Sequence, residues 1–335
     1  MSRNNTSPES SLLLAIDALQ DSIALQPRND NDGLWYYNNV ANLSAYRGLS
    51  YLDGMYSYPL FAILSAASSE DGQAISSSCD DVYTQFRILY EHCGQPSGLL
   101  SHGYDATKNH SWADPVTGAS PIVWGRAQAW YTLGLLNVLQ SSALDVCYPH
   151  IKIQLRQLLE DVAEPQLIAA QDSEAMAGSR FGVWQVVDRA WKPKNFIESS
   201  ASFMSTYSLM RAARLGFIPE FRHGRMSVTE LATGIFYSNY YEYLMKHANG
   251  SVSLTGTSKV ASLREDVVDY EVWLSDPVGD GCVALTIRPS TTFPRASRII
   301  VCWGPVPLSW LVLRLHGWKS TVESGWEENR IREKG

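Results

Sequence analysis

The sequence has few charged residues, no cluster of basic ones and no apolar run of membrane-spanning length. Charged residues make up 18% of the 335 positions, and the formal net charge is −7. Phosphate binding requires a basic surface, so we expect no nucleic-acid partner. A transmembrane helix requires about 20 consecutive apolar residues, so we expect no membrane partner either. The early apolar run Leu12–Ile16 is too short for a signal peptide and is followed by acidic residues, which favours a cytoplasmic protein.

Cysteine is also sparse. The five cysteines are scattered, and none forms a CxxC pair or a Cys/His spacing typical of a metal site. We therefore expect no metal, no cofactor and no disulfide framework.

Apolar and aromatic side chains, in contrast, are abundant. Hydrophobic residues make up 45% of the chain, which is enough for a sizeable core. The 11 Trp and 17 Tyr residues suit a carbohydrate site, because aromatic rings stack on the C–H faces of sugars and hydrogen-bond at their edges. Core packing is nevertheless the commoner use of any single ring.

Helical periodicity dominates the first 250 residues. Apolar positions recur three and four residues apart in many segments, and helices are also expected over 54–67, 125–140 and 227–246. Glycine-led segments that resemble one another follow successive helices, with a period of roughly 65–85 residues. Such repeated helical pairs bury their faces against each other and can close into an α/α toroid with the elaborate loops at one end. We expect short β pieces only in these loops and near 250–287.

Carboxylate, His, Arg and Trp side chains concentrate in the loops, which indicates a polar ligand site, and each of them has a structural alternative. Asp53 precedes a helix, where Asp usually caps the free backbone N–H groups. Arg126 lies in a first helical turn, where the dipole disfavours a cation, so it requires a carboxylate partner from a ligand or from the protein. His102 is equally compatible with a structural role, and Glu198 with helix capping.

Several loop segments resemble glycoside hydrolase family 105, the unsaturated rhamnogalacturonyl hydrolases. The segments are SYLDGMYSYPLF, LLSHGYDATKNHSWADPVTGASPIVWGRAQAWY and FIESSASFMSTYSL, followed by GSVSLTGTSKVASL and DYEVWLSDPV. They occur in the family's order between about residues 15 and 285. The resemblance implies an all-α fold, the (α/α)6 helical barrel of six hairpins. It also implies action on unsaturated uronic-acid oligosaccharides left by rhamnogalacturonan lyases.

The resemblance further implies roles for individual residues. The Asp of the LDGM motif, Asp53, corresponds to the general acid/base. The substrate-binding positions are Tyr36, His102, Trp124, Arg126 and Trp130. Tyr36 stands where many bacterial members have histidine. One carboxyl group suffices for this reaction, because it can protonate C4 of the C4=C5 double bond and then take a proton from the water that adds at C5.

The barrel is expected to be incomplete. Only about four loop units are recognisable, the sequence is expected to begin inside what corresponds to the third hairpin, and the family's second active-site Asp has no counterpart. We expect a helical-barrel domain over residues 1–285 and a divergent tail over 286–335. Two alternatives stay open: a related hydrolase of unsaturated glucuronyl residues, and a carbohydrate-binding remnant without activity.

Overall fold

The structure is a computed structural model of the whole chain. It describes residues 8–34, 48–177, 181–190, 192–193, 195–220, 222–223, 226–258, 272–273, 282–287 and 297–302. The chain divides into two compact units, Met1–Pro277 and Val278–Gly335. The first unit contains the helices and the candidate site.

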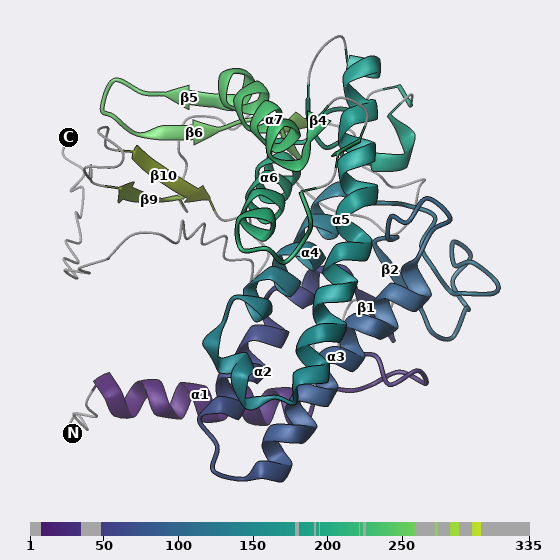
Figure 1. The fold of residues 1–335 in the computed structure, drawn as a ribbon, viewed down its shortest axis with the longest axis vertical. Helices are drawn as coiled ribbons and strands as arrows, with labels where there is room; N and C mark the ends of the chain where they lie inside the picture. Colours follow the sequence, from purple (N-terminus) through teal and green to yellow (C-terminus); the bar gives the residue numbers. More distant parts are fainter. Residues whose placement is uncertain are drawn as a thin grey trace, which may run out of the picture. The chain divides into compact units, whose positions relative to one another are not determined.

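Helical hairpins make up the first unit (Figure 1). Its helices are α1 (Pro8–Ala24), α2 (Tyr58–Ala67), α3 (Gly72–Cys93), α4 (Gly125–Leu139), α5 (Pro149–Ala177), α6 (Ser199–Arg214) and α7 (Val228–Tyr243). Helix α4 packs on both α2 and α6, and α5 packs on both α3 and α7. The three hairpins α2–α3, α4–α5 and α6–α7 therefore contribute one helix each to two layers. This is the predicted all-α architecture of the helical-barrel type, with short β pieces in the loops.

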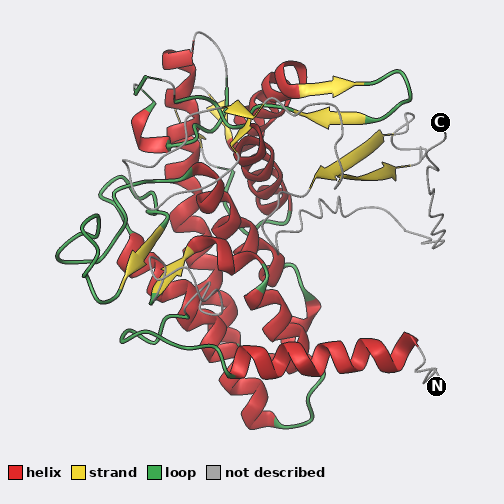
Figure 2. Ribbon diagram, turned by 180° about the vertical axis from the view of Figure 1, so that it is seen from behind, coloured by secondary structure: helices red, strands yellow, loops and turns green. Residues whose placement is uncertain are grey.

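The strands are short and form two-stranded antiparallel pairs (Figure 2). In the first unit they are β1 (Leu49–Tyr51), β2 (Gly103–Asp105), β3 (Arg222–His223), β4 (Met226–Ser227), β5 (Leu244–Lys246), β6 (Val252–Leu254), β7 (Thr257–Ser258) and β8 (Val272–Trp273). Strands β1 and β2 join the first two long loops, and a bridge between Trp124 and Val186 joins the second to the third. The elaborate loops thus meet at one end, as expected.

Two helix boundaries differ from the prediction. Residues Leu52–Tyr56 form a 3-10 helix, η2, and α2 begins only at Tyr58, because Pro59 lacks an N–H and fits only in a first turn. Helix α7 ends at Tyr243. The turn at Gly250, where φ is +80°, pairs β5 with β6 and so removes residues 244–246 from the helix.

The second unit contains one described hairpin, in which β9 (Cys282–Ile287) pairs with β10 (Ser297–Cys302). This hairpin crosses the domain boundary expected at residue 285. It also places a strand beyond 287, where none was predicted.

The expectation that the cysteines form no disulfide is wrong. Cys79 on α3 and Cys147, just before α5, form a disulfide with a Cα–Cα distance of 5.7 Å. They are 68 residues apart in the sequence and become neighbours only because α3 and α5 lie in the same layer. Spacing alone gives no indication of such a pair. None of the helices in the described ranges combines the length and apolarity needed to cross a bilayer.

Candidate active site

The β1–β2 pair brings Asp53 and His102 together. Tyr51 lies opposite Gly103 in the register, and past the strand ends the backbone N–H of Leu52 donates to the carbonyl of His102 at 3.1 Å. The Asp53 carboxylate (Oδ2) then lies 3.0 Å from His102 Nε2. The histidine side chain is 4% exposed and the aspartate side chain 33%. The pair is therefore a buried imidazole beside a carboxylate that solvent can reach.

Asp53 does not cap a helix. It lies inside the first turn of η2, where Tyr51 occupies the N-cap position and no side chain accepts a capping hydrogen bond. The capping interpretation is therefore wrong for this residue, and the partner of its carboxylate is His102. Helix η2 lies against α4, and the close approach requires Gly134, because a Cβ there would collide with the carbonyl oxygen of Met55.

Aromatic rings surround the imidazole of His102. Trp124 stacks on it with 6.1 Å between ring centroids, and Tyr51 meets it edge-on at 5.5 Å. Trp124 is only 1% exposed, so it supports the imidazole instead of offering a face to solvent. Trp130 is also buried, and its ring lies 4.5 Å from that of Tyr56 in η2. Both tryptophans therefore contact the residues or the helix that carry the Asp53–His102 pair.

Arg126 has an internal carboxylate partner. Its Nη1 atom lies 3.3 Å from Glu198 Oε1, and both Nη atoms donate to the carbonyl of Ser258 at 3.0 Å. The Glu198 side chain is 1% exposed and caps α6, accepting from the N–H of Ala201 and also from that of Ser258. Of the alternatives for Arg126, the structure provides the internal carboxylate, and the capping interpretation of Glu198 is confirmed.

Asp105 is a buried residue whose role the sequence analysis missed. Its carboxylate accepts hydrogen bonds from Thr107, Asn109 and His110 and so fixes the loop that follows β2. Burial raises the pKa of Asp105, but the hydrogen bonds from His110 and Thr107 outweigh this effect and lower the pKa to about 2. Asp followed by Thr two residues later is typical of an Asx-turn and could have indicated this role.

Tyr36 lies outside the described residues. Among the residues that are described, no group of three or more His, Cys, Asp and Glu side chains could hold a metal ion. The chemical capacity of the site resides in Asp53 and His102, since a hydrogen-bonded carboxylate and imidazole can donate and accept protons at a bound substrate.

Comparison with known proteins gives a family and several structural relatives. The family model described as Glycosyl Hydrolase Family 88 matches residues 3–278. Protein Atu3128 of Agrobacterium fabrum and the 24.9 kDa protein in the picA locus of Rhizobium radiobacter are each 31% identical over 208 residues, which is 59% of this chain and 82% of the relative.

Solved structures share the fold. A glycoside hydrolase of family 105 from C. acetobutylicum is 25% identical, with a TM-score of 0.61 over 74% of this chain and 62% of that one. The unsaturated glucuronyl hydrolase from Bacillus sp. GL1 is 14% identical, with a TM-score of 0.51 over 75% of this chain and 61% of that one. The chain thus spans about three fifths of the length of these relatives.

Proposed function

The chain belongs to Glycosyl Hydrolase Family 88, and from this membership we propose that it hydrolyses oligosaccharides that end in an unsaturated uronic acid. The observation that carries the proposal is the 3.0 Å contact between Asp53 and His102, made by two loops that β1 and β2 join. The finer proposal is that the sugar released is unsaturated galacturonic acid from rhamnogalacturonan fragments. The family 105 motifs of the sequence and the 25% identical family 105 structure support it.

Asp53 acts as the general acid/base in this proposal. Its carboxyl group protonates C4 of the conjugated C4=C5 bond, which leaves an oxocarbenium-like centre at C5. Water adds there and returns a proton to Asp53, and the resulting hemiketal opens and releases the rest of the sugar chain. A positioned acid/base of this kind contributes typically about 10²–10⁴-fold to the rate. His102 orients the carboxylate through its Nε2 contact.

The remaining residues have supporting roles in the proposal. Trp130 contacts the sugar, Tyr36 keeps the substrate-binding role that the motif resemblance implies, and Trp124 supports the imidazole of His102. Arg126, whose side chain is 17% exposed, contacts the substrate carboxylate, while Glu198 balances part of its charge. Arg126 is therefore a weaker anion clamp than an arginine without an internal partner.

The test is loss of the ultraviolet absorbance of the conjugated double bond on incubation with two substrates. One carries unsaturated galacturonate linked to rhamnose, and the other carries unsaturated glucuronate from a glycosaminoglycan. We expect consumption of the first and little of the second. The reverse preference would overturn the finer proposal, and consumption of neither would overturn the proposed activity and favour a non-catalytic carbohydrate-binding protein.

Asp53→Asn tests the acid/base assignment, with Asp145→Asn as the matched control. Asp145 lies in the first turn of another 3-10 helix, η3 (Ser142–Val146), and its exposed carboxylate pairs with Lys152 on the surface. We expect Asp53→Asn to lower kcat by about 10²–10⁴-fold with little change in KM, and Asp145→Asn to leave both unchanged. Wild-type turnover in Asp53→Asn would show that the assignment is wrong.

A further inference from the structure

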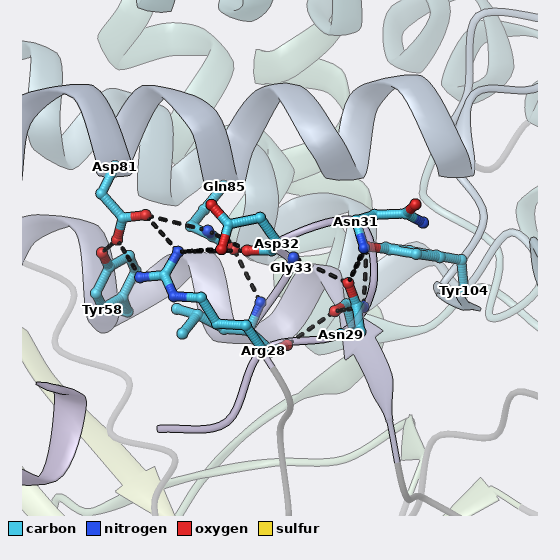
Figure 3. Close-up of polar contacts among 11 residues, drawn as sticks. Arg28, Asn29, Asn31, Asp32, Gly33, Tyr58, Asp81, Gln85 and Tyr104 are labelled. Atoms are coloured by element: carbon cyan, nitrogen blue, oxygen red, sulfur yellow. Dashed lines mark hydrogen bonds and ion pairs between the residues drawn. The ribbon is translucent and has the colours of Figure 1, made fainter. Parts of the chain in front are cut away.

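A buried polar network adjoins the strands that hold the candidate catalytic pair (Figure 3). Its centre is Asn29, which is 8% exposed and lies between α1 and β1. The Nδ2 atom of Asn29 donates to Ser50 Oγ and to the hydroxyl of Tyr104, both at 3.1 Å. Ser50 and Tyr104 are directly opposite each other in the β1–β2 register. One amide group therefore bridges the two strands at a single step of the ladder.

The same ladder leads to the candidate catalytic pair. Ser50 precedes Asp53 by three residues, and Tyr104 follows His102 by two. The Ser50–Tyr104 pair and the Asp53–His102 pair are separated by the Tyr51–Gly103 step and by the hydrogen bond from Leu52 to the carbonyl of His102. A displacement of β1 against β2 would therefore change the 3.0 Å distance between Asp53 Oδ2 and His102 Nε2.

Asn29 is itself held rigidly by its own turn. Its Oδ1 atom accepts from the N–H groups of Gly33 at 2.9 Å and Asn31 at 3.0 Å, and its backbone exchanges hydrogen bonds with Gly33 and Asp32. Gly33 is required at its position, because a Cβ there would collide with the Tyr104 hydroxyl. The amide thus has both acceptor contacts and both donor contacts satisfied, which fixes its orientation.

Helix α3 anchors this turn from the other side. Arg28 forms a bidentate ion pair with Asp81, at 2.6 and 3.0 Å, and Gln85 donates to the carbonyl of Asp32 at 2.9 Å. Tyr58 also donates to Asp81. Burial alone would raise the pKa of Asp81, but the hydrogen bonds from Arg28 and Tyr58 hold it below its ordinary value. The turn is therefore bonded to α3 as well as to the two strands.

We propose that Asn29 is a positioning residue, which fixes β1 against β2 and thereby sets the geometry of the Asp53–His102 contact. This proposal rests on the proposed function for its effect on catalysis. The geometric part, that Asn29 controls the contact, stands independently. Misplacement of a catalytic group by about 1 Å can lower the rate by about 10²-fold.

The first experiment compares Asn29→Ser with Asn239→Ser. Asn239 on α7 is also buried, at 1% exposed, and also donates two hydrogen bonds, to the carbonyls of Phe181 and Ile235, but these lie away from β1 and β2. We expect Asn29→Ser to lower kcat about 10–100-fold with little change in KM. Asn239→Ser should lower the free energy of unfolding by a similar amount and leave kcat unchanged. Equal effects of the two variants on kcat would overturn the proposal.

A second variant tests the proposal if Asn29→Ser folds poorly, and a second measurement tests it if the protein has no hydrolase activity. Tyr104→Phe removes one partner of Asn29 while preserving the ring, and we expect a smaller fall in kcat in the same direction. The imidazole ¹⁵N resonances of His102, assigned by their loss in His102→Gln, report its contact with Asp53 without any substrate. We expect Asn29→Ser to move these resonances toward their values in Asp53→Ala. Resonances that coincide with the wild type would overturn the proposal, whereas a shift in a protein without hydrolase activity would support it and overturn only the proposed function.

Discussion

Opening the Cys79–Cys147 disulfide should destabilise the first unit strongly. The bond closes a loop of 68 residues between α3 and the start of α5. The chain-entropy relation gives about 4 kcal/mol for a loop of this length, because the open chain gains that freedom in its unfolded state. With a urea slope of about 2–3 kcal/mol per M, the unfolding midpoint should fall by roughly 1–2 M.

The assay is urea unfolding of the oxidised protein, of the reduced protein and of the double variant Cys79→Ala/Cys147→Ala. The reduced protein and the double variant should agree, apart from the small loss of sulfur packing in the variant. Cys93 on α3 is buried and unpaired, and burial raises the pKa of its thiol, so it should stay unreactive while the fold is intact. Coincident midpoints of the oxidised and reduced proteins would refute the reasoning.

Peptide mapping of the native protein without reduction gives an independent check. It should yield a linked pair of peptides that contains Cys79 and Cys147. Disulfides persist mainly in oxidising compartments, so the same map also tests the cytoplasmic location expected from the sequence.

Three further predictions concern residues around the candidate site. The depressed pKa of Asp105 contributes about 2 kcal/mol to stability above its ordinary pKa of 3.8, and this contribution should be lost as the pH falls from about 4 to about 2. Urea unfolding at several pH values should show this slope, and Asp105→Asn should reduce it by the contribution of this one group. Gly134→Ala should cost about 1–3 kcal/mol in urea unfolding and lower turnover, because the added methyl group pushes the Met55 carbonyl and η2 away from α4. Arg126→Ala should destabilise the protein by about 3–5 kcal/mol, since Glu198 would keep a buried charge, and it should raise KM. Adding Glu198→Gln should restore the stability but leave KM raised. An unchanged unfolding midpoint in Gly134→Ala or in Arg126→Ala would contradict the contact assigned to that residue.

The sequence predicted the fold class well because helix pairing is largely local. Apolar residues at helical spacing mark the helices, and glycine-led loops at a regular period mark the hairpins. The errors fall where a short-range feature overrides the periodicity. Pro59 restricts where α2 can begin, and the turn at Gly250 converts residues 244–246 to a strand.

The candidate site was less predictable, because its geometry depends on contacts between distant segments. Motif resemblance selected Asp53 and His102, but only the pairing of β1 with β2 explains why they meet. The partner of Arg126 depends on the packing of α4 against α6, which places Glu198 beside it. No local pattern encodes a contact across 72 residues, so the sequence left this partner open.

The proposed proton-transfer pair and the candidate anion-binding arginine are held by different parts of the first unit. Asp53 and His102 are positioned by β1, β2 and α4, all within the first two hairpins and the loop before them. Arg126 starts on the same α4 but bonds to Glu198 at the start of α6 and to Ser258 in β7. A change at Glu198 should therefore alter substrate affinity more than the chemical step, whereas a change in the β1–β2 ladder should do the opposite. Helix α4 connects the two groups, because Trp124 supports the imidazole and Arg126 follows it by two residues.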